Sequence, residues 1–250
     1  MAGGSDMWGN ADHLHFTYAQ RTGDFDVRVR VKSLVARDAS TKAGFTVRES
    51  LDMDSRNLHA IVMPPDARNI YEAGTRADTA GATAGWGVLG GANGNIPATF
   101  PNSWIRLKRV ENIFKAYAST DGQNWTLYAH NTPSPAYPAT VFVGLATTSH
   151  NNNTGQTTLA EYTDFGDVPD TSGPVFLSLK QVPPDVLILR FDEALDKTTA
   201  EQVSNYSLDQ GVTISSATLG SDLESVTLKT AAGLTPKAVY TLTLNNLKDR

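Results

Sequence analysis

Residues 25–31, FDVRVRV, decide how this chain is interpreted, because apolar and polar side chains alternate strictly along them. Every second residue from Phe25 onward is apolar, and the residues between are Asp26, Arg28 and Arg30. Successive side chains of a β-strand point to opposite faces, so a period of two is the pattern of a strand with one buried face. This stretch therefore predicts a half-buried strand.

The same alternation continues along the chain and predicts an all-β fold, since helical periodicity is scarce. Residues 104–109 and 113–119 are expected to form a hairpin, and the Asp-Gly pair within 120–124 (TDGQN) suits a tight turn. Further strands are expected at 43–49, 58–63, 70–75, 125–129, 140–147 and 157–165. Short strands joined by turns rich in Gly, Asn, Asp and Pro are typical of a β-sandwich or jelly roll.

A change of composition at residues 166–174 (GDVPDTSGP) indicates a linker between two domains. We expect the first domain at 1–168 and a second, smaller β-sandwich at 169–250. Its strands are expected at 175–182, 186–191, 212–219, 223–230 and 238–244, with one short helix at 198–203. The chain stops at NLKDR, where a turn should lead into a final strand, and an open edge favours aggregation. The second domain is therefore expected to be truncated, or completed by something outside this chain.

Composition and charge exclude several classes of function. Of the 250 residues, 40% are hydrophobic and 19% are charged, which is enough apolar material to build a core. The net charge of −5 argues against a nucleic-acid partner, since phosphates call for a basic face. Cysteine is absent, which excludes disulfides, cysteine-based zinc sites and thiol catalysis. Because no run of 18 apolar residues occurs, no membrane span is expected.

Several segments of the first domain resemble one known family, most specifically the hairpin SWIRLKRVENIFKAYASTDGQNWT with its W-x-R-L-K-R and S-x-D-G-x-x-W motifs. KAGFTVRESLDMDSRNLH and VFVGLATTSHNNNTGQTTLAEYTDF add to the likeness. Residues 5–168 look like the concanavalin A-like/laminin-G-like β-sandwiches of bacterial extracellular, often carbohydrate-active, multidomain proteins. The remainder resembles bacterial Ig-like modules. The resemblance implies a concanavalin A-like jelly-roll sandwich followed by a smaller Ig-like β-sandwich, but it implies function only weakly.

Location and partners follow from that resemblance. It implies an extracellular protein whose partners are a polysaccharide or other glycan and further domains of the same parent protein. The first residues, MAGGSDMW, lack the basic and apolar regions of a secretory signal. The chain is therefore either cytosolic or has lost its signal and upstream domains, and we favour the second interpretation.

The candidate binding residues are those that suit a glycan, which stacks on an exposed ring and uses polar groups for its hydroxyls. Trp86 lies alone in the Gly- and Ala-rich stretch 79–103 and is expected to be an exposed platform. Arg48, Tyr71 and Arg76 lie on or beside the flanking strands and are expected to line one groove with it. The alternative for these three is a solvated sheet face with ordinary ion pairs. Trp104 and Trp125 are expected in the core.

The acidic stretch 49–54 (ESLDMD) raises the question of catalysis, because retaining glycosidases use two carboxylates about 5 Å apart. Glu49 and Asp52 are three residues apart, so an unbroken strand sends them to opposite faces. Asp52 and Asp54 share a face, but Asp54 already starts a polar turn. We therefore expect no enzyme.

No metal or other cofactor is expected. His13 and His15 share a strand face, but a third ligand at matching spacing is not visible. Asp52, Asp54 and Asn57 do not match the spacing of a helix-loop-helix calcium site. A structural calcium ion, which such sandwiches often hold, is left open.

The favoured function is a non-catalytic carbohydrate-binding fragment of a larger secreted bacterial protein. One alternative is a structural or adhesive segment of a surface or fibre-forming protein with no small ligand. The third hypothesis is a glycan hydrolase or lyase that uses Asp52 and Asp54 or acids not recognised in the sequence.

Overall fold

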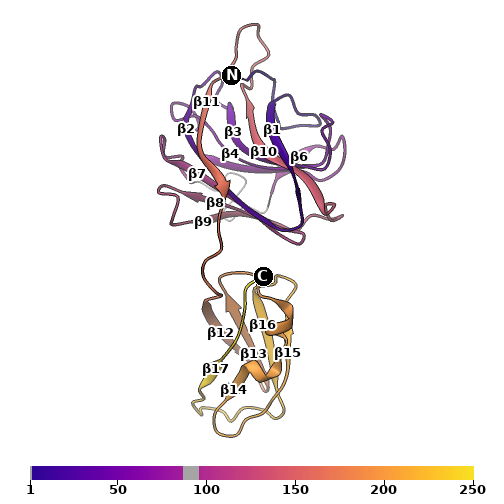
Figure 1. The fold of residues 1–250 in the computed structure, drawn as a ribbon, viewed down its shortest axis with the longest axis vertical. Coiled ribbons are helices and arrows are strands. Elements are labelled where there is room, and N and C mark those ends of the chain that lie inside the picture. Colours follow the sequence, from indigo (N-terminus) through magenta and orange to yellow (C-terminus); the bar gives the residue numbers. More distant parts are fainter. Residues whose placement is uncertain (1, 87–95) are drawn as a thin grey trace. The chain divides into compact units, whose positions relative to one another are not determined.

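The computed structural model describes residues 2–86 and 96–250 of the chain. The chain divides into two compact units, Met1–Pro169 and Asp170–Arg250. Both are built from antiparallel strands, so the predicted all-β sandwich fold is confirmed (Figure 1). Within the described residues, no helix is both long and apolar enough to cross a membrane.

Two sheets form the first unit. The six-stranded sheet has the order β1-β10-β3-β4-β5-β6, and the five-stranded sheet has the order β11-β2-β7-β8-β9. The strands of the six-stranded sheet are β1 (His15–Thr22), β3 (Lys42–Arg48), β4 (Asn57–Val62), β5 (Tyr71–Arg76), β6 (Thr83–Gly85) and β10 (Thr140–Thr148). Those of the five-stranded sheet are β2 (Phe25–Leu34), β7 (Ser103–Val110), β8 (Ile113–Ser119), β9 (Thr126–Asn131) and β11 (Ala160–Asp167).

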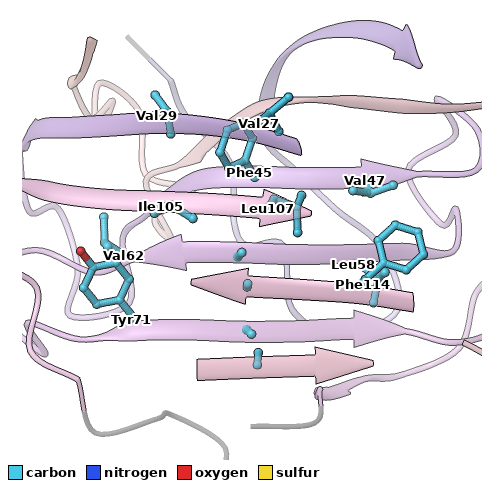
Figure 2. Packing of buried hydrophobic residues seen from close by; sticks show 14 of the residues in the cluster. Val27, Val29, Phe45, Val47, Leu58, Val62, Tyr71, Ile105, Leu107 and Phe114 are labelled. Atoms are coloured by element: carbon cyan, nitrogen blue, oxygen red, sulfur yellow. The ribbon is translucent and has the colours of Figure 1, made fainter. Parts of the chain in front are cut away.

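The core of this unit lies between the two sheets and follows the alternation in the sequence. The apolar residues of β2 are almost fully buried, and the charged residues between them are partly exposed. Phe45 and Val47 of β3 and Leu58 of β4 meet them from the other sheet (Figure 2). The half-buried strand predicted at 25–31 is therefore confirmed as part of β2.

The second unit is a smaller sandwich with two sheets of unequal size. A four-stranded sheet has the order β12-β13-β16-β15, and β14 pairs with β17. These strands are β12 (Phe176–Val182), β13 (Val186–Phe191), β14 (Tyr206–Leu208), β15 (Ile214–Leu219), β16 (Ser225–Thr230) and β17 (Leu242–Leu244). The expected helix at 198–203 is observed as α1 (Lys197–Ala200), capped by Asp196, and is followed by a 3-10 turn, Val203–Asn205.

Strand β12 differs from the other strands of this sheet because all of its residues are exposed. Leu179 lies opposite Leu189 of β13, so both side chains point to the same side of the sheet. Leu189 is fully buried, whereas Leu179 is 43% exposed. β14 lies beside β15, so the two-stranded sheet covers the part of the larger sheet that is remote from β12. The apolar side of β12 therefore contributes little to the core of this unit.

This contrast predicts very different costs for the same substitution at two neighbouring positions. Leu189→Ala removes a fully buried side chain and is expected to lower the free energy of unfolding by about 2–4 kcal/mol. Leu179→Ala is the matched control and is expected to cost less than about 1 kcal/mol, because its side chain already contacts water. Urea unfolding of the two variants measures both values. Equal losses of unfolding free energy in the two variants would mean that the side of β12 that carries Leu179 is covered in solution.

Candidate functional site

A shallow open groove on the outer face of the six-stranded sheet is the best candidate for a binding site. Its volume is about 210 Å³. One wall comes from β1, the opposite wall from the loop between β3 and β4, and the floor from the residues that lead into β1 and from the end of β3. The lining residues are Asp12, Leu14, Phe16, Tyr18, Arg48, Leu51 and Met53. We call this the outer-sheet groove.

The wall formed by β1 is aromatic. Phe16 and Tyr18 are two residues apart on the strand, so they share its outer face, and their rings stack with centroids 5.0 Å apart. The ring of Phe142, from the neighbouring strand β10, meets Tyr18 edge-on at 5.4 Å. Tyr18 is 46% exposed, although large aromatic side chains are usually mostly buried. This wall therefore presents a ring that a ligand can reach.

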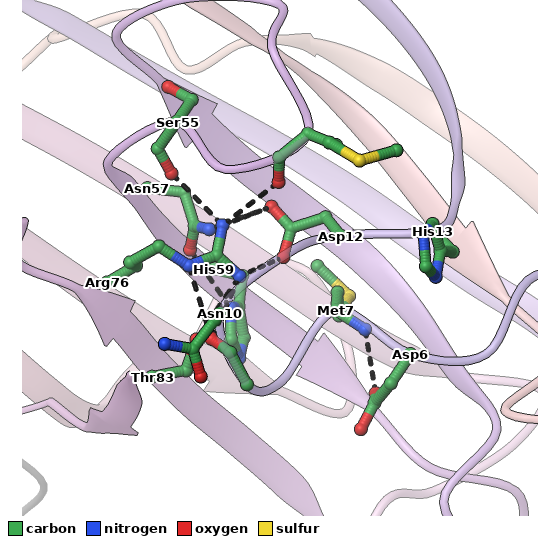
Figure 3. Close-up of polar contacts among 12 residues, drawn as sticks. Asp6, Met7, Asn10, Asp12, His13, Ser55, Asn57, His59, Arg76 and Thr83 are labelled. Carbon is green, nitrogen blue, oxygen red and sulfur yellow. Dashed lines mark hydrogen bonds and ion pairs between the residues drawn. The ribbon is translucent and has the colours of Figure 1, made fainter. Parts of the chain in front are cut away.

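A buried carboxylate lies at the floor of the groove. Asp12 accepts hydrogen bonds from Arg48 and from Arg76. Figure 3 shows the contact with Arg76, whose Nη2 lies 2.5 Å from the carboxylate. Asn57 Nδ2 donates to the same carboxylate at 2.9 Å. Only 2% of the Asp12 side chain is exposed. Burying an ion is costly unless it is paired and hydrogen-bonded, and Asp12 is both.

Arg76 joins three parts of the chain that are far apart in sequence. Besides Asp12, it donates to the carbonyl oxygens of Gly9 at 3.1 Å, Met53 at 3.2 Å and Ser55 at 3.1 Å. Its side chain is fully buried. A guanidinium has five N–H donors in a rigid plane, which suits several acceptors at once. Arg76 therefore fixes the N-terminal segment and the β3–β4 loop to the sheet.

The β3–β4 loop contains the ESLDMD stretch, and its backbone rather than its acids faces the arginines. Arg48 donates from Nη2 to the carbonyl oxygen of Asp52 at 2.6 Å. Leu51 and Met53 point outward, with 49% and 54% of their surfaces exposed, and form the second wall of the groove. Glu49 lies 3.6 Å from Arg56, outside the lining of the groove. The stretch thus supplies an apolar rim.

Met7 and Trp8, in the segment before β1, lie on the outer face of the six-stranded sheet. Met7 packs in a small apolar cluster with Ile61 of β4, and Trp8 meets the ring of His59 edge-on at 5.8 Å. A Cβ added to Gly74 would lie 2.4 Å from the His59 ring and 2.9 Å from Trp8, so only glycine fits there. The segment therefore covers β4 and β5 and leaves the β1 side of the sheet open.

His59 is enclosed by this arrangement and is held neutral. It is fully buried, and burial lowers its pKa from 6.5 to about 3, with further lowering from the positive charges of Lys42, Arg76 and Arg48. Its Nδ1 lies 3.4 Å from Oδ1 of Asn57, the residue that also donates to Asp12. The imidazole is therefore a packed, uncharged part of the polar cluster.

The structure brings together only two of the four predicted binding residues. Arg48 and Arg76 share Asp12, and Arg48 lines the groove. Tyr71 and Trp86 are each 1% exposed and lie in the core between the sheets. The prediction that Trp86 is an exposed platform is therefore wrong, and Tyr71 does not line the groove.

The placement of Tyr71 follows from a rule that the sequence already contained. Tyr71 and Arg76 are five residues apart on β5, so an unbroken strand places them on opposite faces. Trp86 follows the short strand β6, and its backbone N–H donates to the carbonyl of Ala73 on β5 at 3.2 Å, which holds the ring against the core. The glycine content around Trp86 gave no sign of this contact; residues 87–95 of that stretch lie outside the described residues.

The expectation that Trp104 and Trp125 are core residues is also wrong. Both are partly exposed, and their rings stack with arginines on the outer face of the five-stranded sheet. Trp104 alternates with Ile105, which is fully buried, so parity places it outward.

Five residues that line the groove were not predicted from the sequence: Asp12, Phe16, Tyr18, Leu51 and Met53. Alternation along 14–18 was the signal that could have revealed the two rings.

The described residues contain one gathering of carboxylates with the spacing of metal ligands. It lies in the second unit, where ligand oxygens of Asp170, Glu193 and Asp249 lie within 4.8 Å of one another. Acidic groups of this kind are common without an ion, so the cluster alone assigns no metal. His13 and His15, considered above as ligands, contact Ser5 and Thr17 respectively.

Comparison with known proteins gives no family. No family model matches the chain, and no curated protein matches it. Among solved structures, a functionally unknown protein from Saccharomyces cerevisiae is similar, with 18% sequence identity over 67% of this chain and 84% of that chain and a TM-score of 0.49. A likeness at this level supports no inference about function.

The buried ion cluster predicts a large effect of a small change at Asp12. Asp12→Asn keeps the shape of the side chain but removes the charge that Arg48 and Arg76 share, and is expected to cost about 3–5 kcal/mol. Asp52→Asn in the same region is the control, because Asp52 is exposed, and should change stability by less than about 0.5 kcal/mol. Chemical denaturation measures both. A change below about 1 kcal/mol for Asp12→Asn would contradict the view that Asp12 fixes this region.

The lowered pKa of His59 predicts a specific loss of stability in acid. The unfolded chain takes up a proton at His59 below its ordinary pKa of 6.5, whereas the folded protein resists protonation down to about 3. The contribution of neutral His59 to the free energy of unfolding is therefore complete above pH 6.5. It decreases as the pH falls from 6.5 toward 3. At pH 4.5 the loss is expected to be about 2–3 kcal/mol.

His59→Gln keeps a polar side chain of similar size and does not titrate in this range. Urea unfolding at pH 7 and pH 4.5 should show that the free energy of unfolding decreases less in acid for the variant than for the wild type. The other groups titrate alike in both proteins. If both proteins lose the same stability, His59 is not buried as a neutral imidazole.

Proposed function

We propose that the first unit is a non-catalytic carbohydrate-binding domain, and that the outer-sheet groove holds the glycan. The stacked rings of Phe16 and Tyr18, along a groove with a polar floor, are the observation that supports this. The apolar C–H face of a sugar packs on an aromatic ring, and its hydroxyls need hydrogen-bonding groups nearby. Tyr18 offers both kinds of contact, because its exposed side chain carries a ring and a hydroxyl group.

The size and shape of the groove favour part of a longer glycan over an enclosed small molecule. Its volume of about 210 Å³ is below the range of about 300–1,000 Å³ that is usual for pockets that bury a small ligand. The exposed rims, Tyr18 on one side and Leu51 and Met53 on the other, extend the contact surface beyond the floor. A polymer lying across the surface can use both rims.

The arrangement of acids supports binding without catalysis. Glycoside hydrolysis uses two carboxyl groups on either side of the scissile bond. The groove is lined by a single carboxylate, Asp12, and that one is held between Arg48 and Arg76.

A structural or adhesive role without a small ligand is the second candidate, and the exposed apolar side chains of β12 favour it. Secretion and further domains in the same protein are part of the proposal and rest on the resemblance in sequence.

Replacing Tyr18 should abolish or strongly weaken glycan binding. Stacking on an aromatic ring contributes on the order of 1 kcal/mol or more, so Tyr18→Ala is expected to weaken binding by about tenfold. Affinity electrophoresis in gels that contain soluble polysaccharides measures the retardation of each protein. The matched control is Phe176→Ala in the second unit, where an aromatic side chain of similar exposure, 43% against 46%, is not among the residues that line the groove.

Two results would overturn the proposal. The first is that no polysaccharide in a broad panel retards the wild-type protein, or that Tyr18→Ala is retarded equally. The second is release of sugar from any polysaccharide, which would make the protein an enzyme. Loss of that release in Asp52→Asn would assign catalysis to the β3–β4 loop.

A further inference from the structure

The outer face of the five-stranded sheet has a chemistry different from that of the outer-sheet groove. The residues of β2, β7 and β8 that alternate with the core side chains point away from the core, and most are basic or aromatic. We call this surface the basic face. Its cations are Arg28, Arg30, Lys32, Arg106, Lys108 and Lys115. Its acids are Asp26, Glu161 and Asp164 on the strands and Asp121 in the turn between β8 and β9. The face therefore carries two more positive charges than negative ones, on a chain whose net charge is −5.

Guanidinium groups and aromatic rings alternate across this face. Arg28 and Arg30 both lie over the ring of Trp104, at 5.8 and 5.5 Å from its centroid. Arg106 lies over the rings of Tyr117 at 5.3 Å and Trp125 at 5.8 Å. Stacking of this kind holds a guanidinium plane in place while its N–H donors remain at the edge of the plane.

The turn between β8 and β9 fixes the position of Trp104. Gly122 has a φ of +71°, and a Cβ at this position would lie 2.9 Å from the Trp104 ring. Glycine therefore allows the turn to lie against the indole. The carbonyl of Gly122 accepts a hydrogen bond from Nη1 of Arg28 at 3.2 Å. The turn, the indole and Arg28 thus form one packed unit.

Arg28 differs from the other arginines of the basic face in its partners. Arg30 pairs with Asp164 at 3.0 Å, and Arg106 forms two hydrogen bonds with Asp26 at 2.8 and 2.5 Å. Arg28 donates to one backbone carbonyl, and no carboxylate among the described residues pairs with it. Its Nε and Nη2 donors are therefore available to an oxyanion in solution.

We propose that the basic face binds an acidic polysaccharide, with a carboxylate or sulfate of the polymer on Arg28 and a sugar ring beside Trp104. The positive charge of the face complements the charge of such a polymer, and the indole supplies the apolar contact that a sugar needs. Arg30, two residues further along β2, is held by Asp164 and leaves Arg28 as the guanidinium that takes the anionic group.

Duplex DNA fits the basic face less well. It carries one negative charge per about 1.7 Å of its axis, so tight binding needs many cations along a continuous path. Most cations of the basic face are already paired with Asp26, Glu161 or Asp164. An excess of two positive charges is better matched to a polymer with sparser charge.

The test is retention of the full chain on immobilised polysaccharides and on duplex DNA, with a salt gradient. The probes are heparin for sulfate groups, polygalacturonate for carboxylates and a neutral glucan as the uncharged reference. The wild type is expected to bind at least one acidic matrix at low salt and to elute as the salt concentration rises, whereas any retention on the neutral glucan through the outer-sheet groove should not depend on salt. Arg28→Ala is expected to bind the acidic polymer about tenfold more weakly.

Three further variants make the result specific. Arg28→Lys keeps the charge but loses the planar donor pair, so its affinity should fall between those of the wild type and Arg28→Ala. Lys197→Ala changes the net charge equally in the second unit, where its side chain is 73% exposed, and should bind like the wild type. Tyr18→Ala should also keep this binding, which separates the basic face from the outer-sheet groove. Circular dichroism and thermal unfolding confirm that each variant is folded.

Several outcomes would overturn the proposal. They are passage of the wild type through both acidic matrices, equal retention of folded Arg28→Ala and wild type, and retention on duplex DNA as strong as that on either acidic polysaccharide. Equal loss of retention in Lys197→Ala and Arg28→Ala would show that net charge alone, and not the basic face, is responsible.

Discussion

The outer face of the six-stranded sheet depends on one buried carboxylate, Asp12, held between Arg48 and Arg76. Two guanidiniums in one buried site would repel each other strongly if no anion lay between them, because the protein interior screens charge weakly. Asp12 supplies that anion from residues 2–14, so the same interaction that balances the charge also attaches this segment to the sheet. His59 stays neutral chiefly because burial lowers its pKa, and the positive charges of Lys42, Arg76 and Arg48 lower that pKa further.

This constraint also decides where a ligand can bind. Residues 2–14 cover β4 and β5, and Trp8 and Met7 fill the surface there. The aromatic side chains of β1 lie beyond the covered area, and the β3–β4 loop is held beside them through its carbonyl oxygens. The groove therefore depends on the ion cluster: Asp12 and Arg48 of the cluster form part of its floor, and one of its walls is a loop that the cluster positions.

Alternation in the sequence predicts most of the strands, although β1, β6 and β14 were not among the predicted ranges, and it also bears on the candidate site. Strand β2 alternates as residues 25–31 predicted, and the same parity rule places Tyr71 inward and Trp104 outward. The aromatic character of Tyr71 and Trp104 therefore says less about their burial than their position in the alternation does. The contacts of Asp12 were beyond this reasoning, since its partners lie 36 and 64 residues away and no local spacing reports them. Trp86 was misplaced for the same reason, because its backbone partner lies on β5.

On the two outer faces of the first unit, the pairing of the charged groups decides which ligand fits, more than the number of charged groups does. At the outer-sheet groove, Arg48 and Arg76 are buried and their donors are used by Asp12 and by backbone carbonyls, so they build structure and leave aromatic side chains for contact. On the basic face, arginines rest on aromatic rings at the surface, where desolvation costs less and Arg28 needs no carboxylate. A polar ligand of low charge suits the first surface and an anionic one suits the second. One sandwich can thus present two chemically distinct faces because its core fixes both sheets independently of what their outer sides carry.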